Sequence, residues 1–264
     1  MPITDKDTYI TDPNRPRSIL SKIFLSSRFT FYLQAFIIVW RSGRRALKGL
    51  YDAAEWAESS CEIMQALENV GVQFEITGMK NISGFDGPVV FICNHMSTLE
   101  TFILPCIIQP VKPVTFVVKE SLKEMAVFGP VMRSRDPVVV GRTNPREDLK
   151  TVLIEGTKKL SSGQSIIIFP QSTRSSTLNP EEFNSLGIKL ALKAGVPVVP
   201  IAVKSDAWGV GKIKKDFGPI DPRKKVYFAF GEPMKLQARG TEEHQKIISF
   251  IKGKLEEWGR EGIN

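Results

Sequence analysis

From Phe74 onward, short runs of β-branched and aromatic residues alternate with stretches of helical pattern. The runs contain four to six continuous apolar residues, and such strands are covered on both faces. Strands that alternate with helices are typical of an α/β domain with a mostly parallel sheet flanked by helices. The runs are 74–77, 89–93, 115–119, 138–141, 166–169, 198–203 and 226–231, and the helical stretches are 97–108, 121–128, 145–162, 183–195 and 241–259.

The N-terminal segment has a different pattern. Between Arg15 and Leu50 lie eight basic residues and no acidic one, around an uncharged apolar run at 29–40. A twelve-residue helix rises about 18 Å, which is short of the roughly 30 Å hydrocarbon core of a bilayer. The run is therefore either a buried core helix or an interfacial helix, and the surrounding cations favour a helix that lies among anionic headgroups.

A second helix is indicated at 51–70, where apolar side chains share one broad face before Gly71. We therefore expect residues 1–72 to form a two-helix, membrane-associating appendage, and residues 73–264 to form the α/β domain. A net charge of +8 also favours an anionic partner. No nucleic-acid motif is present and the apolar run is aliphatic, so we expect the partner to be a lipid bilayer and not nucleic acid.

Histidine and cysteine are scarce in this chain. The only histidines are His95 and His244, which excludes a three-histidine metal site. Three cysteines, an odd number in a long chain, do not make a disulfide framework, and a reducing compartment fits them. Cys93 is expected to pack in the core.

His95 follows the strand predicted at 89–93, and Glu100 lies five residues further on, in the helix that comes next. A carboxylate bonded to one ring nitrogen fixes the tautomer and raises the basicity of the other nitrogen. The second nitrogen can then remove a proton from a hydroxyl. This spacing alone is a weak signal, and a histidine that only caps its own turn remains the alternative.

Polar residues also follow the strand predicted at 166–169. Arginine offers a planar fork of donors that matches a phosphate, and Arg174 stands four residues after Pro170. A solvated turn is the alternative. Arg142 follows the strand predicted at 138–141 in the same way. The two prolines of 196–201 are unfavourable in a central strand, so this strand would lie at an edge or line a channel.

Four segments occur in order: His95-x4-Glu100, Gly129…Arg142, Phe169-Pro-Gln-Ser-Thr-Arg174-Ser175 and Val196-Pro-Val-Val-Pro200. Together they resemble the four blocks of the phospholipid/glycerol acyltransferase family over about residues 75–205. The resemblance implies transfer of a fatty acyl group from acyl-CoA or acyl carrier protein to the free hydroxyl of lysophosphatidic acid, which makes phosphatidic acid in phospholipid biosynthesis.

The resemblance also assigns roles to residues. It makes His95 the catalytic base and Glu100 its partner, and it places the acceptor's phosphate on Arg174, Arg142 and Lys119. It implies no metal, no cofactor beyond the acyl donor and no covalent acyl-enzyme. We expect a peripheral or monotopic protein on the cytoplasmic face of the membrane.

Four positions depart from the family pattern. Glu100 replaces an aspartate, Gln171 and Ser172 replace a glutamate and a glycine, and Asn184 stands where a lysine is frequent. We expect Ser172 and Thr173 to add hydroxyl or backbone donors to the phosphate and Gln171 to contact the acceptor. These departures leave open another acceptor (glycerol 3-phosphate or another lysolipid), a thioester hydrolase, or a catalytically silent lipid-binding protein of the same fold.

Overall fold

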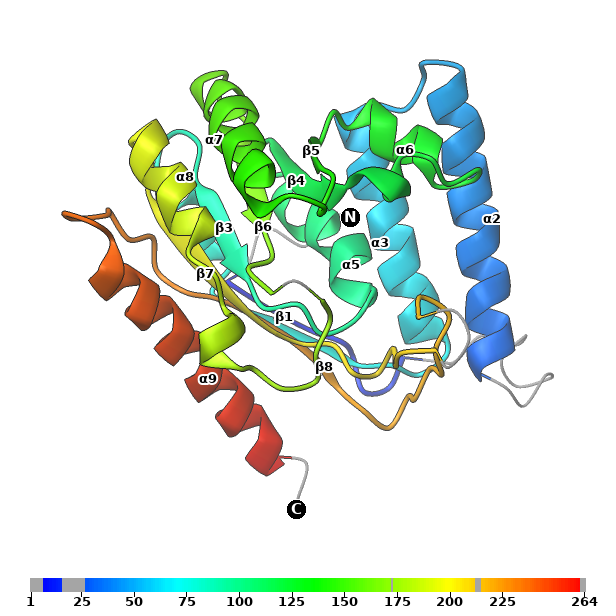
Figure 1. Cartoon of the computed structure of the whole chain (residues 1–264). Helices are drawn as coiled ribbons and strands as arrows, with labels where there is room; N and C mark the ends of the chain where they lie inside the picture. Colours follow the sequence, from blue (N-terminus) through cyan, green and yellow to red (C-terminus); the bar gives the residue numbers. More distant parts are fainter. Residues whose placement is uncertain (1–6, 16–26, 172, 212–214, 262–264) are drawn as a thin grey trace.

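The computed structural model describes residues 7–15, 27–171, 173–211 and 215–261. In these residues, eight strands form one sheet in the order β1-β2-β8-β7-β3-β6-β4-β5 (Figure 1). The strands are β1 (Thr8–Ile10), β2 (Phe74–Thr77), β3 (Val90–Cys93), β4 (Val114–Lys119), β5 (Val138–Val140), β6 (Ser165–Ile168), β7 (Val198–Lys204) and β8 (Val226–Phe230).

The sheet is mostly parallel, as predicted. The five strands β7-β3-β6-β4-β5 run parallel to one another, and β2 runs parallel to β8. The β7–β8 and β1–β2 pairs are antiparallel. The carboxyl ends of five strands therefore lie at the same end of the sheet, where sites gather in sheets of this kind. These strands are β3, β6, β4, β5 and β7.

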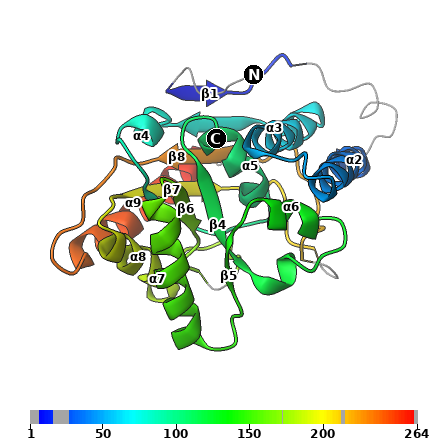
Figure 2. The same ribbon diagram turned by 90° about the horizontal axis from the view of Figure 1, so that it is seen from above.

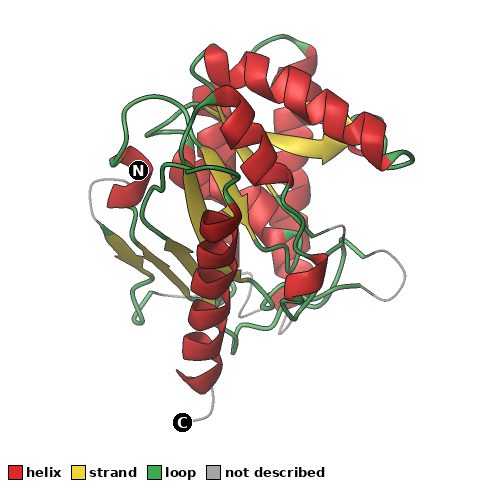
Figure 3. Ribbon diagram, turned by 60° about the vertical axis from the view of Figure 1, so that its left-hand side comes forward, coloured by secondary structure: helices red, strands yellow, loops and turns green. Residues whose placement is uncertain are grey.

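Helices cover both faces of the sheet (Figures 2 and 3). One hydrophobic cluster joins α3 and α5 to the sheet, and a second joins α7, α8 and α9 to its opposite face. The helices are α2 (Ser27–Leu47), α3 (Ala53–Asn69), α4 (Lys80–Ser83), α5 (Leu99–Ile108), α6 (Gly129–Ser134), α7 (Pro145–Ser161), α8 (Leu186–Ala194) and α9 (Thr241–Glu261), with 3₁₀ turns η2 (Glu120–Leu122) and η3 (Pro180–Glu182).

Strand β3 shows why the apolar runs are continuous. Phe91 and Cys93 belong to the cluster under α3 and α5, whereas Val90 and Ile92 belong to the cluster under α7, α8 and α9. Successive side chains of a strand point to opposite faces, and here both faces are covered.

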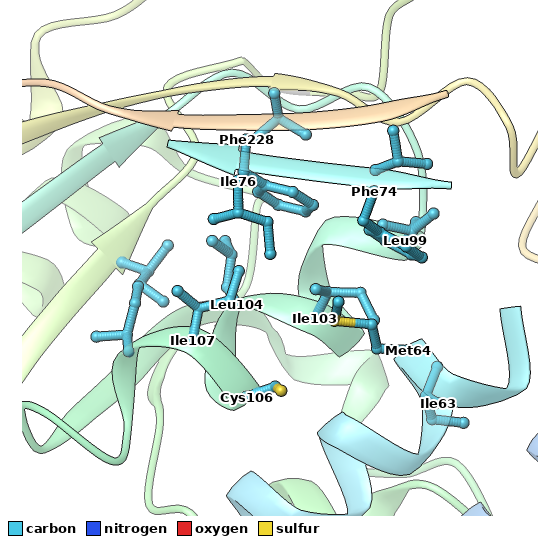
Figure 4. Packing of buried hydrophobic residues seen from close by; sticks show 14 of the residues in the cluster. Ile63, Met64, Phe74, Ile76, Leu99, Ile103, Leu104, Cys106, Ile107 and Phe228 are labelled. Carbon is cyan, nitrogen blue, oxygen red and sulfur yellow. The ribbon is translucent and has the colours of Figure 1, made fainter. Parts of the chain in front are cut away.

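Helix α3 packs directly against α5 and the sheet (Figure 4). Its Ile63 and Met64 are buried in the same cluster as Ile103 of α5, Phe74 of β2 and Phe228 of β8. Helices α2 and α3 lie within residues 1–72, but α3 shares its core with residues beyond 72, so a separate two-helix appendage is not confirmed. Strand β1, which was not predicted, also belongs to this segment.

Helix α2 lies at the outer edge of the molecule, beside α3 and α6 (Figures 1 and 2). Phe31 and Ala35 on its inner side are buried in the core. Five apolar residues on its outer side are exposed; they form the apolar face of α2 and are Phe29, Leu33, Phe36, Ile37 and Trp40. None of the helices in the described part of the chain is long and apolar enough to cross a membrane.

Strand β7 occupies the centre of the sheet despite Pro200, so the expectation of an edge strand is wrong. The Pro200 carbonyl accepts a hydrogen bond from Gly231 N, which lies just beyond the end of β8. The N and C=O of one strand residue point to the same side, so the missing N–H of Pro200 faces a place where the β8 ladder has already ended.

The helix predicted at 121–128 is also wrong. The chain forms the turn η2 and then α6, which begins at Gly129. Pro130 lies in the first turn of α6, where its fixed φ favours helix initiation. A Cβ on Gly129 would lie 2.4 Å from the Lys123 carbonyl oxygen, so this close approach requires glycine.

Cys61 and Cys106 form a disulfide between α3 and α5, which corrects the expectation drawn from the cysteine count. They are 45 residues apart in the sequence and meet because the two helices pack side by side. Cys93 is a free, buried thiol in the core, as predicted. Burial and the nearby Glu100 raise the pKa of this thiol, so it stays protonated.

Candidate active site

The first two predicted residues, His95 and Glu100, form a hydrogen-bonded pair. His95 follows β3, and Glu100 lies in the first turn of α5, so the intervening turn brings the carboxylate back to the ring. His95 Nδ1 lies 2.9 Å from Glu100 Oε1. An ionised carboxylate only accepts hydrogen bonds, so Nδ1 carries the proton and Nε2 is the nitrogen that can act as a base.

The Glu100 carboxylate is completely buried and is held by four further donors. Its Oε1 accepts hydrogen bonds from Met96 N at 2.6 Å and Ser97 N at 2.8 Å. Its Oε2 accepts from Ser205 Oγ at 2.6 Å and Ser97 Oγ at 3.1 Å. Burial alone would raise the pKa of Glu100, but the bonds from His95, Ser205 and Ser97 lower it below its ordinary value. The carboxylate is therefore ionised at neutral pH.

This ionisation predicts an acid-sensitive contribution to stability. A folded-state pKa below the ordinary 4.5 stabilises the fold above pH 4.5, and the contribution is lost as pH falls through the folded value. The difference in unfolding free energy between wild type and Glu100→Gln should therefore be constant above about pH 5 and should shrink below pH 4.5. Urea unfolding followed by circular dichroism measures it. A difference that is unchanged down to pH 3 would contradict the assignment.

The loop after β6 holds His95 in place. The Phe169 ring stacks on the imidazole with centroids 4.3 Å apart. Gln171 Oε1 accepts a hydrogen bond from His95 N at 2.7 Å, and Ser175 N donates to His95 O at 2.9 Å. The Gln171 side chain is buried, so the structure uses it to position the His95 backbone. The expectation that Gln171 contacts the acceptor is therefore replaced by this role.

Arg174 lies beside the His95–Glu100 pair. Its Nη1 donates to the hydroxyl of Thr98, two residues before Glu100. Its Nη2 lies 2.6 Å from Asp216 Oδ1. Thr98 Oγ1 in turn donates to Asp216 Oδ1 at 3.3 Å. The Arg174 guanidinium, which offers several N–H donors, thus lies next to the His95–Glu100 pair.

The remaining predicted phosphate ligands lie further along the carboxyl end of the sheet. Lys119 ends β4 and Arg142 follows β5, two and three strands from β3. With strands about 4.8 Å apart, these backbones lie roughly 10 and 14 Å from that of His95. Thr173 is exposed next to Arg174, and Ser172 lies outside the described residues.

The backbone of Arg142 adopts an unusual conformation. Its φ of 58° falls in the left-handed region, which an arginine rarely adopts. Asp148 Oδ1 accepts hydrogen bonds from Gly141 N and Arg142 N and so holds this turn. Asp148 thus stabilises a strained backbone conformation at the end of β5.

Three residues of the site were missed from the sequence. Ser205 directly follows β7, and the rule that sites gather at strand ends could have found it. Thr98 lies within the first block, but a threonine in a turn carries no distinct signal. Asp216 lies in the β7–β8 connection, 42 residues after Arg174, and no local pattern links the two.

Asn184, which stands where the family frequently has a lysine, has a structural role. Its Nδ2 donates to the Pro170 carbonyl, and its Oδ1 accepts from Leu186 N at the start of α8. It thereby ties the loop after β6 to α8. Helix α8 begins at Leu186, three residues later than predicted.

Two proteins with similar sequences carry the same name. The chain is 33% identical over 132 residues to 1-acyl-sn-glycerol-3-phosphate acyltransferase of Pseudomonas aeruginosa, a match that covers 50% of this chain and 49% of that one. It is 28% identical over 195 residues to the Saccharomyces cerevisiae protein of the same name, covering 67% and 62%. The chain thus spans about half to three fifths of the length of these relatives.

The fold has a counterpart among solved structures. The crystal structure of the 1-acyl-sn-glycerophosphate (LPA) acyltransferase PlsC from Thermotoga maritima matches with a TM-score of 0.67 and 20% identity, over 89% of this chain and 96% of that one. Residues 73–204, half of the chain, match the acyltransferase family, and this segment contains the buried His95–Glu100 pair and Arg174. The chain belongs to the acyltransferase family.

Proposed function

We propose that the protein is an O-acyltransferase that moves a fatty acyl group from acyl-CoA or acyl carrier protein to the free hydroxyl of lysophosphatidic acid. The observation that carries this proposal is the His95–Glu100 pair, with Arg174 reaching Thr98 between them. A base next to a phosphate-binding cation is the arrangement that acylation of a phosphorylated alcohol needs. A protein that only binds lipid needs no buried, ionised partner for a histidine.

The reaction then follows from the groups at hand. His95 Nε2 removes the proton of the acceptor hydroxyl, and the alcohol oxygen attacks the thioester carbonyl. The carbon–sulfur bond breaks, the thiolate leaves, and the proton on Nε2 passes to it. Glu100 stabilises the imidazolium that forms between these steps. The thioester is already activated, so no covalent acyl-enzyme, metal or further cofactor is part of the proposal.

Arg174 is the proposed ligand of the acceptor's phosphate. Its side chain is 20% exposed, so it is reachable from outside yet shielded enough to strengthen a charged contact. Lys119, Arg142, Thr173 and Ser172 are proposed as further contacts along the same edge. Because Gln171 and Asn184 have structural partners, their departure from the family pattern gives no support to a different acceptor.

A narrow apolar pocket of about 20 Å³ lies between α2, α3, α5 and α6, and its lining marks the proposed direction of the acyl chain. Its wall includes Thr101 and Phe102, which directly follow Glu100. The apolar side chains of the pocket come from α2, α3, α5, α6 and the residues just before α3 and α6: Ile38, Val39, Tyr51, Trp56, Ile63, Phe102, Phe128, Val131 and Met132.

The apolar face of α2 supports the proposed peripheral or monotopic position on a membrane. Side chains spaced along one side of a helix and exposed to water form a surface that an acyl-chain region can cover. Among the N-terminal cations that the structure describes, three pair with acidic residues of α3, namely Arg15 with Glu68, Arg41 with Glu62 and Arg45 with Glu55. The proposal of a membrane contact therefore depends mainly on the apolar face of α2 and less on the N-terminal cations.

Product analysis tests this function. Purified protein is incubated with labelled long-chain acyl-CoA or acyl carrier protein and lysophosphatidic acid, and products are identified by mass spectrometry. We expect labelled phosphatidic acid. Arg174→Ala should lower kcat/KM for lysophosphatidic acid by about 10- to 100-fold, because a hydrogen bond to a charged group is lost. The same variant should change kcat/KM for monoacylglycerol, which lacks the phosphate, by less than about threefold.

The alternatives give distinct products. Free fatty acid without acyl acceptor product would indicate a hydrolase. Equal losses on both acceptors would remove Arg174 from the phosphate site. Lipid binding without any acyl product, on a panel that includes glycerol 3-phosphate and other lysolipids, would support the silent binder.

A further inference from the structure

Arg174, the proposed phosphate ligand, already pairs with a carboxylate of the same chain, that of Asp216. The Asp216 carboxylate lies 2.6 Å from Arg174 Nη2 and accepts a second hydrogen bond from the Thr98 hydroxyl. The Arg174 Nη1 also donates to Thr98. Asp216 therefore occupies two donors that an acceptor phosphate bound at Arg174 would use.

A carboxylate and a phosphate monoester place the same demand on an arginine. Both present negatively charged oxygens that accept N–H donors, and both bind the planar guanidinium end-on. The Asp216 side chain is 45% exposed, so the pair lies at the protein surface. An ion pair at this exposure is weak compared with a dianionic phosphate on the same donors. An acceptor phosphate can therefore displace the Asp216 carboxylate from Arg174.

The backbone around Asp216 is anchored independently of its side chain. Trp208 Nε1 donates to the Asp216 carbonyl at 3.1 Å. The next two carbonyls are held by α2, through Arg28 Nη2 to Phe217 O and Tyr32 OH to Gly218 O. The carboxylate can therefore leave Arg174 by rotation of its own side chain while these backbone contacts stay in place.

We propose that Asp216 is an internal substitute for the acceptor phosphate. It pairs with Arg174 when no acceptor is bound, and a phosphorylated acceptor must displace it. Asp216 thereby sets the KM for phosphorylated acceptors and has no effect on neutral ones. This inference rests on the proposed role of Arg174, and the experiment below separates the two.

The test uses Asp216→Asn in the full chain. The substitution keeps the size of the side chain and removes its charge. We expect the KM for lysophosphatidic acid to fall about tenfold with kcat unchanged, and the KM for monoacylglycerol to stay the same. Calorimetry with sn-glycerol 3-phosphate as the probe should show binding about tenfold tighter than in wild type, which requires no acyl transfer.

Asp136→Asn is the matched control. Asp136 pairs with Lys159 and is 89% exposed. It precedes β5, so it lies at the amino end of the parallel strands, opposite to the site. Its φ of 44° suits asparagine, and the variant has the same net charge as Asp216→Asn. It should bind the probe as wild type does, which removes a general effect of charge.

The outcomes separate the two claims. Unchanged or weaker binding in Asp216→Asn, with binding lost in Arg174→Ala, would overturn the role of Asp216 and retain Arg174 as the phosphate ligand; Asp216 would then be a positioning residue. Binding unaffected by Arg174→Ala would overturn both. A tenfold gain in Asp216→Asn that disappears in the Arg174→Ala, Asp216→Asn double variant would support the proposal.

Discussion

Replacing His95 by alanine should lower kcat for acyl transfer by about 10²- to 10⁴-fold, because a positioned general base contributes acceleration of this size. The remaining contacts of Glu100 should keep the variant folded. Its carboxylate still accepts from two backbone N–H groups and two serine hydroxyls, so no buried charge is left without partners. Rates from labelled-product assays at saturating acceptor, together with thermal unfolding, measure the effect.

His244→Ala is the control for this experiment. His244 lies on α9, half-buried against the Phe183 ring, and its burial lowers its pKa. It should retain the wild-type rate. A loss below about tenfold in His95→Ala would contradict its role as base, and a loss of the same size in both variants would point to misfolding.

Replacing Phe36 and Trp40 together by serine should weaken binding to anionic phospholipid vesicles by about 10²-fold. The two side chains are 59% and 47% exposed on the apolar face of α2, so they contribute little to the fold. Insertion into the acyl region contributes about 1.5–3 kcal/mol for each large apolar side chain that becomes fully buried. Cosedimentation with vesicles of phosphatidylglycerol and phosphatidylcholine measures the change.

The control for this prediction is Ile154→Ser. Ile154 is a large apolar residue that is 49% exposed on α7, a helix that covers the opposite face of the sheet from α3 and α5. It should bind vesicles as wild type does. Equal binding of the α2 double variant and wild type would refute the apolar face as the membrane contact, even if the enzyme proved active on soluble acceptors.

The layered α/β fold could be predicted because it depends on local patterns. A four-residue apolar run such as 90–93 needs cover on both faces, and helices lie between the strands to supply it. Likewise, the His95–Glu100 pair could be predicted because one turn separates the two residues. The end of a strand and the first turn of the next helix hold them together whatever the rest of the fold does.

Other features depend on which strands become neighbours, and spacing along the chain carries no record of that. Pro200 is tolerated in the centre of the sheet because β8 ends beside it. Ser205 reaches Glu100 across 105 residues because β7 lies next to β3. The Cys61–Cys106 disulfide depends in the same way on the packing of α3 against α5.

The division is clearest at Arg174. The sequence alone identified it as a cation at a strand end, since a basic residue after a buried strand is a local feature. Only the tertiary structure brings Asp216 to its guanidinium, by means of a connection that is anchored on α2 and on Trp208. Local patterning determines which residues can do chemistry, and long-range packing decides which charges meet, because charge pairing depends on distance in space and not along the chain.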